Sequence, residues 1–281
     1  MTDEFIAVGA ATGQVEVRNR DDGQLVGQTI RTAPVSFVEI VGDELLVGDR
    51  ALPELARLAL DPSLTQTGSL THADAPQPFA NNFGIFAGAV AENGDVTAAA
   101  YGPFGDIFLQ RTDGPVEAVR LGDGRTGIQT MSISPDGTTL AAVRGGSGVV
   151  ELWNLDALDQ QGRALDTLFG QTLVLGFIDA QTLVIGGTGG WLQLWDVATG
   201  EAIGSPVRAH DSDLVGVTIN RQQRSMITSS TSSVVWWNLE ESTWPRRLCL
   251  AAGRPLSESE WQRFVPDREY RRTCDEIVEG E

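Results

Sequence analysis

Three short segments of the chain repeat at a constant interval of 42 residues. They read VVELWNL (149–155), WLQLWDV (191–197) and SVVWWNL (233–239), and their matched tryptophans are Trp153, Trp195 and Trp237. A fixed period of this length is typical of proteins built from similar units, in which each unit covers the apolar surface of its neighbours. The chain is therefore expected to form an array of repeats.

Weaker copies of the repeat extend toward the N-terminus. The segment VEVRNRDDGQLVG parallels LQLWDVATGEAIG, which places Arg18 opposite Trp195. Two further copies, LARLALD and DIFLQRTDG, place Leu60 and Arg111 at the same position. The interval between these two residues is 51, and we assign the excess over the period to a turn-rich loop at 62–82.

Each of the clearest periods contains the same series of short strands separated by turns. An apolar strand is followed by a turn, such as SPDG at 134–137, then by a second strand, the Trp-containing strand and a short outer strand. Four strands in about 40–45 residues are the signature of one propeller blade. The sequence thus predicts an all-β propeller with six visible blades.

The first of these blades is expected to be incomplete. It begins at FIAVGA (5–10), which matches a second strand, so its first strand is lacking. Because propellers usually close by pairing strands from both ends of the chain, we expect a longer parent protein with an intact ring of seven blades. One alternative is a true start at Met1 with a strained or open six-blade ring, and another is the remnant of a broken gene.

The repeats also carry a family resemblance. Strands ending in Leu-Trp-Asp or Trp-Trp-Asn, the SPDG turn and the leading segment RAHDSDLVGV resemble WD-repeat β-propellers over residues 4–240. The resemblance implies that each blade Trp is hydrogen-bonded to a Ser/Thr, a His and an Asp. Only Trp237 has candidates, His210 and a Ser among 229–230, and no Asp occurs in 231–233. We expect His210 and the three tryptophans to be structural, and packing between blades to stabilise the ring more than this network.

The charge of the chain argues against several classes of partner. The formal net charge is −18, and all 20 basic residues are Arg. Such a protein repels phosphate backbones, so neither nucleic acid nor an anionic membrane surface is an expected partner. The sequence has no apolar run long enough to span a bilayer and no recognisable secretion signal, so we expect a cytoplasmic protein.

Motifs for catalysis or cofactor binding are not found in the sequence. The chain has no Lys, so a P-loop is impossible, and its glycine-rich segments are interpreted as turns. His72 and His210 have no metal-type partners at close spacing, the carboxylates are scattered, and no G-x-S-x-G occurs. We therefore expect no enzyme activity, no cofactor and no metal.

The surface that remains for function is a rim of the propeller. In WD-repeat proteins the loops between second and third strands commonly dock partners, and here those loops carry Tyr101, Phe104, Arg144 and Trp191. Aromatic and Arg side chains dominate interface hot spots. We expect a protein partner there, with the alternative that Trp191 packs on its neighbouring blade and Tyr101 fills a core. A second hypothesis is a small-ligand or enzymatic propeller with its site in the central channel.

After the last blade the strand pattern gives way to a helical one. We divide the chain into a propeller at 1–243 and a helical tail at 244–281 that packs on it. Trp244, Leu248 and Ala252 fall on one helical face, which must be covered by another surface.

The ends of two short helices can be placed within the tail. Gly253 is a good terminator for the first, and Ser257 with Glu260 forms a capping box for the second. Cys249 and Cys274 would approach each other if the tail folds back, but we expect buried free thiols in a cytosol.

The amino-acid sequence of the tail carries a second resemblance. CLAAGRPLSESEWQRFVPDREYRRTC resembles the closing segment of bacterial multidomain WD-repeat proteins, many of which carry a STAND-class NTPase before the propeller. The matching positions are Cys249, Ala252, Gly253, Arg254, Leu256, Glu260, Trp261, Pro266, Tyr270 and Cys274. The resemblance implies a sensor or scaffold module that regulates an NTPase in cis, upstream of this chain.

Overall fold

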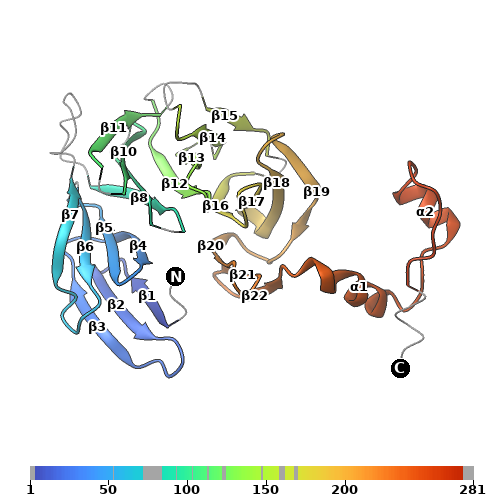
Figure 1. The fold of residues 1–281 in the computed structure, drawn as a ribbon, viewed down its shortest axis with the longest axis horizontal. Helices are drawn as coiled ribbons and strands as arrows, with labels where there is room; N and C mark the ends of the chain where they lie inside the picture. The colour runs from blue at the N-terminus through green and yellow to red at the C-terminus, as the bar shows by residue number, and fades with distance from the viewer. Residues whose placement is uncertain are drawn as a thin grey trace.

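The computed structural model shows six β-sheets arranged as propeller blades around a central channel (Figure 1). The predicted all-β propeller with six visible blades is therefore confirmed. The structure describes residues 4–52, 54–71, 84–92, 94–102, 104–112, 114–121, 125–146, 148–157, 162–167 and 170–274.

The blades follow one another along the chain, with three strands in blades 1 and 6 and four in each of blades 2 to 5. Blades 1 and 2 contain β1 (Phe5–Gly9), β2 (Gln14–Asn19), β3 (Leu25–Ile30), β4 (Val35–Val41), β5 (Glu44–Asp49), β6 (Glu54–Ala59) and β7 (Gln66–Thr71). Blades 3 and 4 contain β8 (Ile85–Val90), β9 (Val96–Tyr101), β10 (Asp106–Arg111), β11 (Val116–Arg120), β12 (Ile128–Ile133), β13 (Thr139–Arg144), β14 (Val150–Asn154) and β15 (Arg163–Leu165). Blades 5 and 6 contain β16 (Thr172–Phe177), β17 (Thr182–Gly187), β18 (Trp191–Asp196), β19 (Glu201–Arg208), β20 (Leu214–Asn220), β21 (Ser225–Ser230) and β22 (Val234–Asn238).

The two end blades lack different strands. In blades 2 to 5 the first strand lies innermost and the fourth outermost, and neighbouring strands run antiparallel. In blade 1, β1 and β2 take the second and third positions, and no innermost strand precedes them among residues 4–30, as predicted. In blade 6 no fourth strand pairs with β22 among the described residues. The ring is thus open between blade 6 and blade 1 in Figure 1.

Two positions of the repeat were predicted wrongly in the early blades. In blade 5, Trp195 of the third strand is the cross-strand partner of the second residue of the second strand. The third-strand residues with this partner in blades 2 and 3 are Leu58 and Gln110. The expected Leu60 and Arg111 lie two residues and one residue farther along the chain. The predicted loop at 62–82 is also wrong in part, because residues 66–71 form the outer strand β7. Because turn lengths vary in these blades, a fixed period counted along the chain does not stay aligned with the positions of the third strands.

Apolar side chains between blades form the core. Trp153 packs with Leu140, Leu109 and Ile107 between blades 3 and 4, and both Trp153 and Trp195 are buried. Their indole Nε1 atoms have no hydrogen-bond partner among the residues that the structure describes. These two tryptophans therefore contribute through packing, as expected from the sequence.

Blade 6 keeps the polar network that the resemblance implied. The Nε1 of Trp237 donates to Thr228 Oγ1 at 2.9 Å, and Thr228 Oγ1 lies 2.8 Å from His210 Nε2. His210 Nδ1 lies 2.6 Å from Ser233 Oγ. The hydroxyl thus comes from Thr228 rather than from the expected Ser among 229–230, and the second ring nitrogen of His210 faces Ser233.

The same register explains why the other tryptophans lack a partner. Thr228 lies two residues after the strand partner of Trp237. The equivalent positions in blades 4 and 5 are Ala142 and Ile185, neither of which carries a hydroxyl. Trp153 and Trp195 therefore have no hydroxyl at the position that Thr228 occupies in blade 6.

Arginine side chains join each pair of blades that follow one another in the chain. Arg111 donates to Leu155 O, and Arg163 donates to the carbonyl oxygens of Val197 and Ala198. A planar guanidinium with five donors suits several acceptors at once. From blade 1 to blade 6 the joining residues are Arg31, Arg57, Arg111, Arg163 and Arg221.

The tail contains the two predicted helices, α1 (Trp244–Ala252) and α2 (Glu258–Phe264). Gly253 ends α1 with φ of 65°, and its N–H donates to Cys249 O at 2.9 Å. Ser257 and Glu260 form the predicted capping box at the start of α2. Both sequence signals therefore mark the helix ends correctly.

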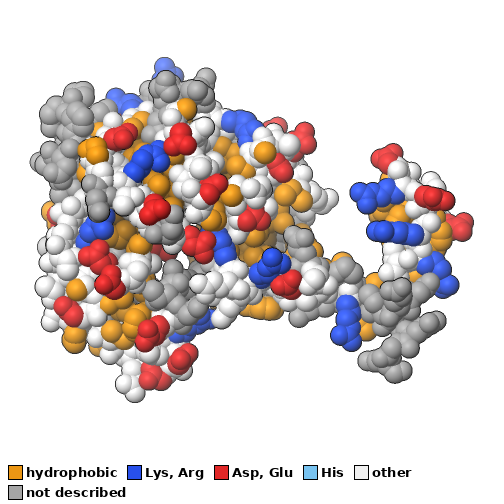
Figure 2. Space-filling view, viewed as in Figure 1, with side chains coloured by type: hydrophobic (Ala, Val, Ile, Leu, Met, Phe, Trp, Pro, Cys, Tyr) orange, Lys and Arg blue, Asp and Glu red, His pale blue; other side chains and the backbone are white. Residues whose placement is uncertain are grey.

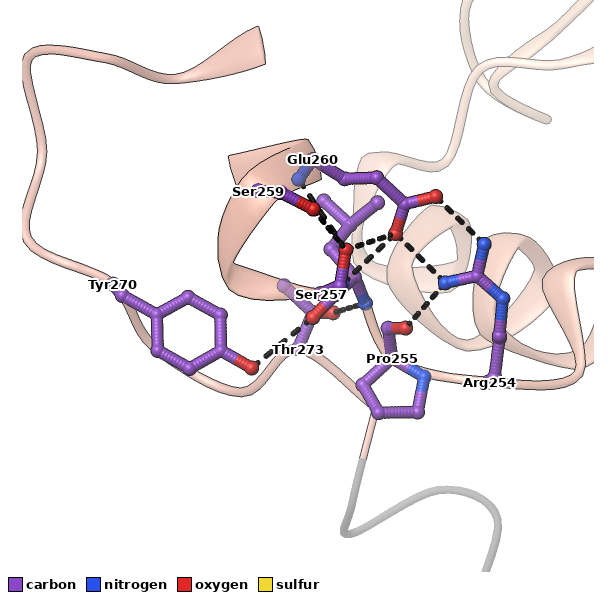
Figure 3. A network of polar contacts seen from close by, with 8 residues as sticks. Arg254, Pro255, Ser257, Ser259, Glu260, Tyr270 and Thr273 are labelled. Carbon is purple, nitrogen blue, oxygen red and sulfur yellow. Dashed lines mark hydrogen bonds and ion pairs between the residues drawn. The ribbon is translucent and has the colours of Figure 1, made fainter. Parts of the chain in front are cut away.

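The segment 249–274 folds into a small lobe closed by its two cysteines. A disulfide joins Cys249 and Cys274, whose Cα atoms are 5.5 Å apart, so the expectation of free thiols was wrong. The two cysteines are brought together because the chain turns back after α2. Figure 3 shows the polar contacts inside the lobe. They include the ion pair of Arg254 with Glu260 and the hydrogen bond that Tyr270 Oη donates to Leu256 O.

The lobe does not lie against the blades. Open space separates it from the propeller in Figure 2, and α1 leads away from blade 6 in Figure 1. The expected packing of the tail on the propeller is therefore not seen. The reason is local, since Trp244 Nε1 donates to Asn238 O at 2.9 Å and directs α1 outward from the end of β22.

Replacement of Thr228 by Val should destabilise the protein by about 1–3 kcal/mol, because Trp237 Nε1 and His210 Nε2 both lose their partner. Replacement by Ser keeps the hydroxyl and should cost less. Thermal and denaturant unfolding of T228V and T228S measure the difference. Equal losses in the two variants would show that the hydroxyl network does not contribute.

Candidate functional site

The four predicted partner-binding residues all lie where a second strand meets a third. Tyr101 and Arg144 end β9 and β13, Phe104 lies in the turn before β10, and Trp191 begins β18. The rim position that the sequence predicted for them is therefore correct. Only Phe104 and Trp191 present their side chains to solvent, with 40% and 37% of their surface exposed.

Tyr101 is a core residue. It is buried and stacks on Phe108 with ring centroids 4.1 Å apart. Burial raises the pKa of the Tyr101 phenol, and the nearby carboxylate of Asp106 adds to this effect. The alternative interpretation, that Tyr101 fills a core, describes its position.

Arg144 is also engaged within the fold. Its Nε donates to Glu151 Oε2 at 2.8 Å and its Nη1 to Thr126 O at 3.3 Å, and the residue is buried. Thr126 precedes β12, so this guanidinium fixes the backbone just before the first strand of blade 4. The expectation that Arg144 contacts a partner is therefore not supported by its position.

Trp191 lies in a polar part of the rim between blades 5 and 6. Its cross-strand partner is Arg208, which is an exposed cation 3.9 Å from Asp211. Gly189, with φ of 71°, donates its N–H to Asp213 Oδ1 at 2.7 Å and fixes the turn before Trp191. A half-exposed indole thus lies beside Arg208 on a turn held by the next blade.

Sequence reasoning did not associate Arg208 with Trp191, because they are 17 residues apart. The pairing depends on the register of β18 with β19, which contains an irregularity between Leu192 and Leu194. A bulge of this kind shifts the facing residues and is not visible in the repeat period.

The central channel is a second candidate. It has a volume of about 880 Å³ and is lined by the innermost strands of blades 2 to 6, β4, β8, β12, β16 and β20. Most of the lining is apolar or small. At one end polar side chains converge, among them Glu39, Glu92 and Arg221.

Arg221 joins the opposite walls of this channel. Its guanidinium donates to Phe177 O and Ile178 O on blade 5 and lies 3.7 Å from Glu92 of blade 3. Burial lowers the pKa of Arg221, while Glu92, Asp179 and Glu39 oppose that change. The mouth of the channel therefore contains a half-buried cation, Arg221, with carboxylates around it.

Glu39 projects from β4 into the same region. The Glu39 side chain is exposed to solvent in the channel. Desolvation by the surrounding channel walls nevertheless raises the pKa of its carboxyl, and attraction to Arg221 only partly offsets this rise. A carboxyl with a perturbed pKa beside a half-buried cation is the kind of arrangement that a polar ligand can use. Among the described residues, no group of three or more His, Cys, Asp or Glu side chains could hold a metal ion.

The sequence matches no protein-family model and no curated protein. In the part of the chain that the structure describes, no helix is both long and apolar enough to cross a membrane. The fold is established by its six blades, and a function must be inferred from the surfaces described above.

Replacement of Glu39 by Gln should stabilise the protein at neutral and alkaline pH. A carboxyl whose folded pKa is raised favours folding below its unfolded pKa, and this contribution is lost as pH rises through the folded value. The melting temperature of E39Q should exceed that of the wild type at about pH 8 and approach it near about pH 4. Glu117→Gln, on the exposed face of β11, is the matched control, and equal shifts in both variants would contradict the assignment.

Proposed function

We propose that the chain is a non-catalytic protein-interaction module that works as a scaffold or sensor. The observation that carries this proposal is Trp191, a half-exposed indole beside Arg208 on a rigid rim. Trp and Arg are the residues that most often dominate binding energy at interfaces. A propeller holds such residues on strand ends, so little ordering is needed when a partner binds.

The finer form of the proposal is a WD-repeat propeller that regulates a bacterial signalling NTPase in the cytoplasm. The strand endings, the SPDG turn and the tail positions from Cys249 to Cys274 support it. In this proposal the NTPase lies in cis before the propeller, and the propeller passes on the binding of a partner protein. The acidic surface disfavours nucleic acid as that partner.

A second candidate function is the binding of a small polar ligand in the channel. Glu39, Glu92 and Arg221 converge there and support this alternative. A ligand-induced rise in melting temperature that Glu39→Gln abolishes and Trp191→Ala retains would favour it over the rim.

Replacement of Trp191 by Ala should weaken partner binding more than tenfold, because loss of a hot-spot Trp costs about 2 kcal/mol or more. Quantitative mass spectrometry of proteins that co-purify with the wild type and with W191A measures this loss. Gln181 lies exposed in the β16–β17 turn, so the Gln181→Ala variant serves as the control. A partner that is retained by W191A, or lost equally in Q181A, would contradict the rim as the docking surface.

A further inference from the structure

The tail lobe has little buried surface of its own. Among the side chains that the structure describes in residues 249–274, three are buried, namely Cys249, Trp261 and Cys274. Phe264, the last residue of α2, is 64% exposed and adds nothing to this core. By comparison, the core between blades 3 and 4 contains 16 buried residues in the described part of the chain. The lobe is therefore held together by few apolar contacts.

Hydrogen bonds join the two halves of the lobe. Tyr270 Oη donates to Leu256 O at 3.1 Å, and Leu256 N donates to Thr273 Oγ1 at 3.2 Å. Trp261 Nε1 donates to Arg268 O at 2.8 Å. Each bond of this kind adds modest stability, because water replaces the partner when the lobe opens. The disulfide adds a covalent connection between residues 25 apart in the sequence, and such a crosslink strongly limits opening.

The propeller does not depend on this disulfide. The lobe lies apart from the blades in Figure 2, and the start of α1 is fixed to the end of β22. Trp244 Nε1 donates to Asn238 O, and Asn238 Oδ1 accepts the N–H of Glu240. These contacts precede Cys249 in the chain, so they can persist when the lobe opens. The sequence contains two cysteines, so a thiol reductant acts at this one bond.

The sulfur atoms are protected only by the lobe itself. Cys249 and Cys274 are each 5% exposed, so a reductant reaches them when the lobe opens locally. A segment with few buried apolar contacts opens at a low cost in free energy. In a cytoplasm, where the proposed function places this chain, disulfides are usually transient and redox-sensing. The Cys249–Cys274 bond is suited to such a role.

We propose that the tail lobe is a redox switch, closed when Cys249 and Cys274 form a disulfide and open when both are thiols. A thiolate of a dithiol reductant attacks one sulfur, and the other leaves as a thiolate and takes up a proton. The second thiolate of the reductant then displaces the remaining Cys, which also takes up a proton. The reductant becomes a disulfide, and the lobe gains two electrons and two protons. Exchange with a disulfide oxidant runs the same steps in reverse.

The switch gives the proposed sensor a signal to sense. Opening separates Trp261 from its edge-on neighbour Tyr270 and frees residues 265–274. The rim around Trp191 is separate from the lobe, so a partner can bind there in either redox state. The switch rests on the proposed function for its cytoplasmic location alone.

Hydrogen exchange of the full chain, followed by mass spectrometry, tests whether the disulfide closes the lobe. Reduction with dithiothreitol should accelerate amide exchange in α2 and residues 265–274 by about 300-fold, the loop-closure effect of a crosslink of this span. Cys249→Ser should show the same fast exchange without reductant. Tyr270→Phe keeps the disulfide and loses one hydrogen bond, so it should accelerate exchange by about tenfold or less. Exchange in blades 4 and 5 should not change in any of these samples.

A lobe that keeps its protection after reduction would overturn the proposal, as would an equal loss of protection in blades 4 and 5. Titration of the wild type with glutathione buffers, followed by alkylation of free thiols, tests reversibility. The disulfide should form in oxidised glutathione and be lost at the reduced ratio of a cytosol. A bond that stays intact at that ratio would make the crosslink permanent, and thiols that stay free in oxidised glutathione would exclude it; either result overturns the switch. Neither measurement involves a partner at Trp191, so failure here leaves the proposed docking rim untouched.

Discussion

The structure depends on one constraint, that a blade has two apolar faces and can cover neither by itself. Trp153 and Trp195 illustrate how strongly packing meets this need, because both are buried although their indole N–H groups have no acceptor among the described residues. A buried donor without a partner costs free energy, so the surrounding apolar contacts must outweigh that cost. The inter-blade arginines add directional bonds where blade edges meet, as Arg163 does at the carbonyl oxygens of Val197 and Ala198.

Where the constraint is not met, the molecule has unusual surfaces. Blade 6 exposes Trp236 on the face that points away from blade 5, and blade 1 exposes Ile6 and Val8 beside the Arg18–Glu16 ion pair. Arg18 takes the place that Trp occupies in later blades, which suits a face that borders solvent. At the polar end of the channel, Arg221 of blade 6 reaches across to Glu92 of blade 3.

Much of the fold could be predicted from the sequence, because strand alternation and the 42-residue period are local properties. Trp153, Trp195 and Trp237 occur at the predicted third-strand position, and Ser257 and Glu260 mark the start of α2. The period failed at Leu60 and Arg111, where turn lengths differ. Of the candidate site, Phe104 and Trp191 proved to be exposed, whereas Tyr101 and Arg144 are buried. Exposure, the Trp191–Arg208 pairing and the convergence on Arg221 depend on tertiary packing, which a pattern along the chain does not contain.

Native-state hydrogen exchange, resolved blade by blade, tests most directly whether packing between blades stabilises the ring. In a repeat array, units with two neighbours are more stable than units at an end. The account predicts the slowest exchange in β9 and β13 of blades 3 and 4, and the fastest in β1 and β2 of blade 1. Uniform protection across all six blades, or slower exchange in blade 1 than in blades 3 and 4, would contradict it.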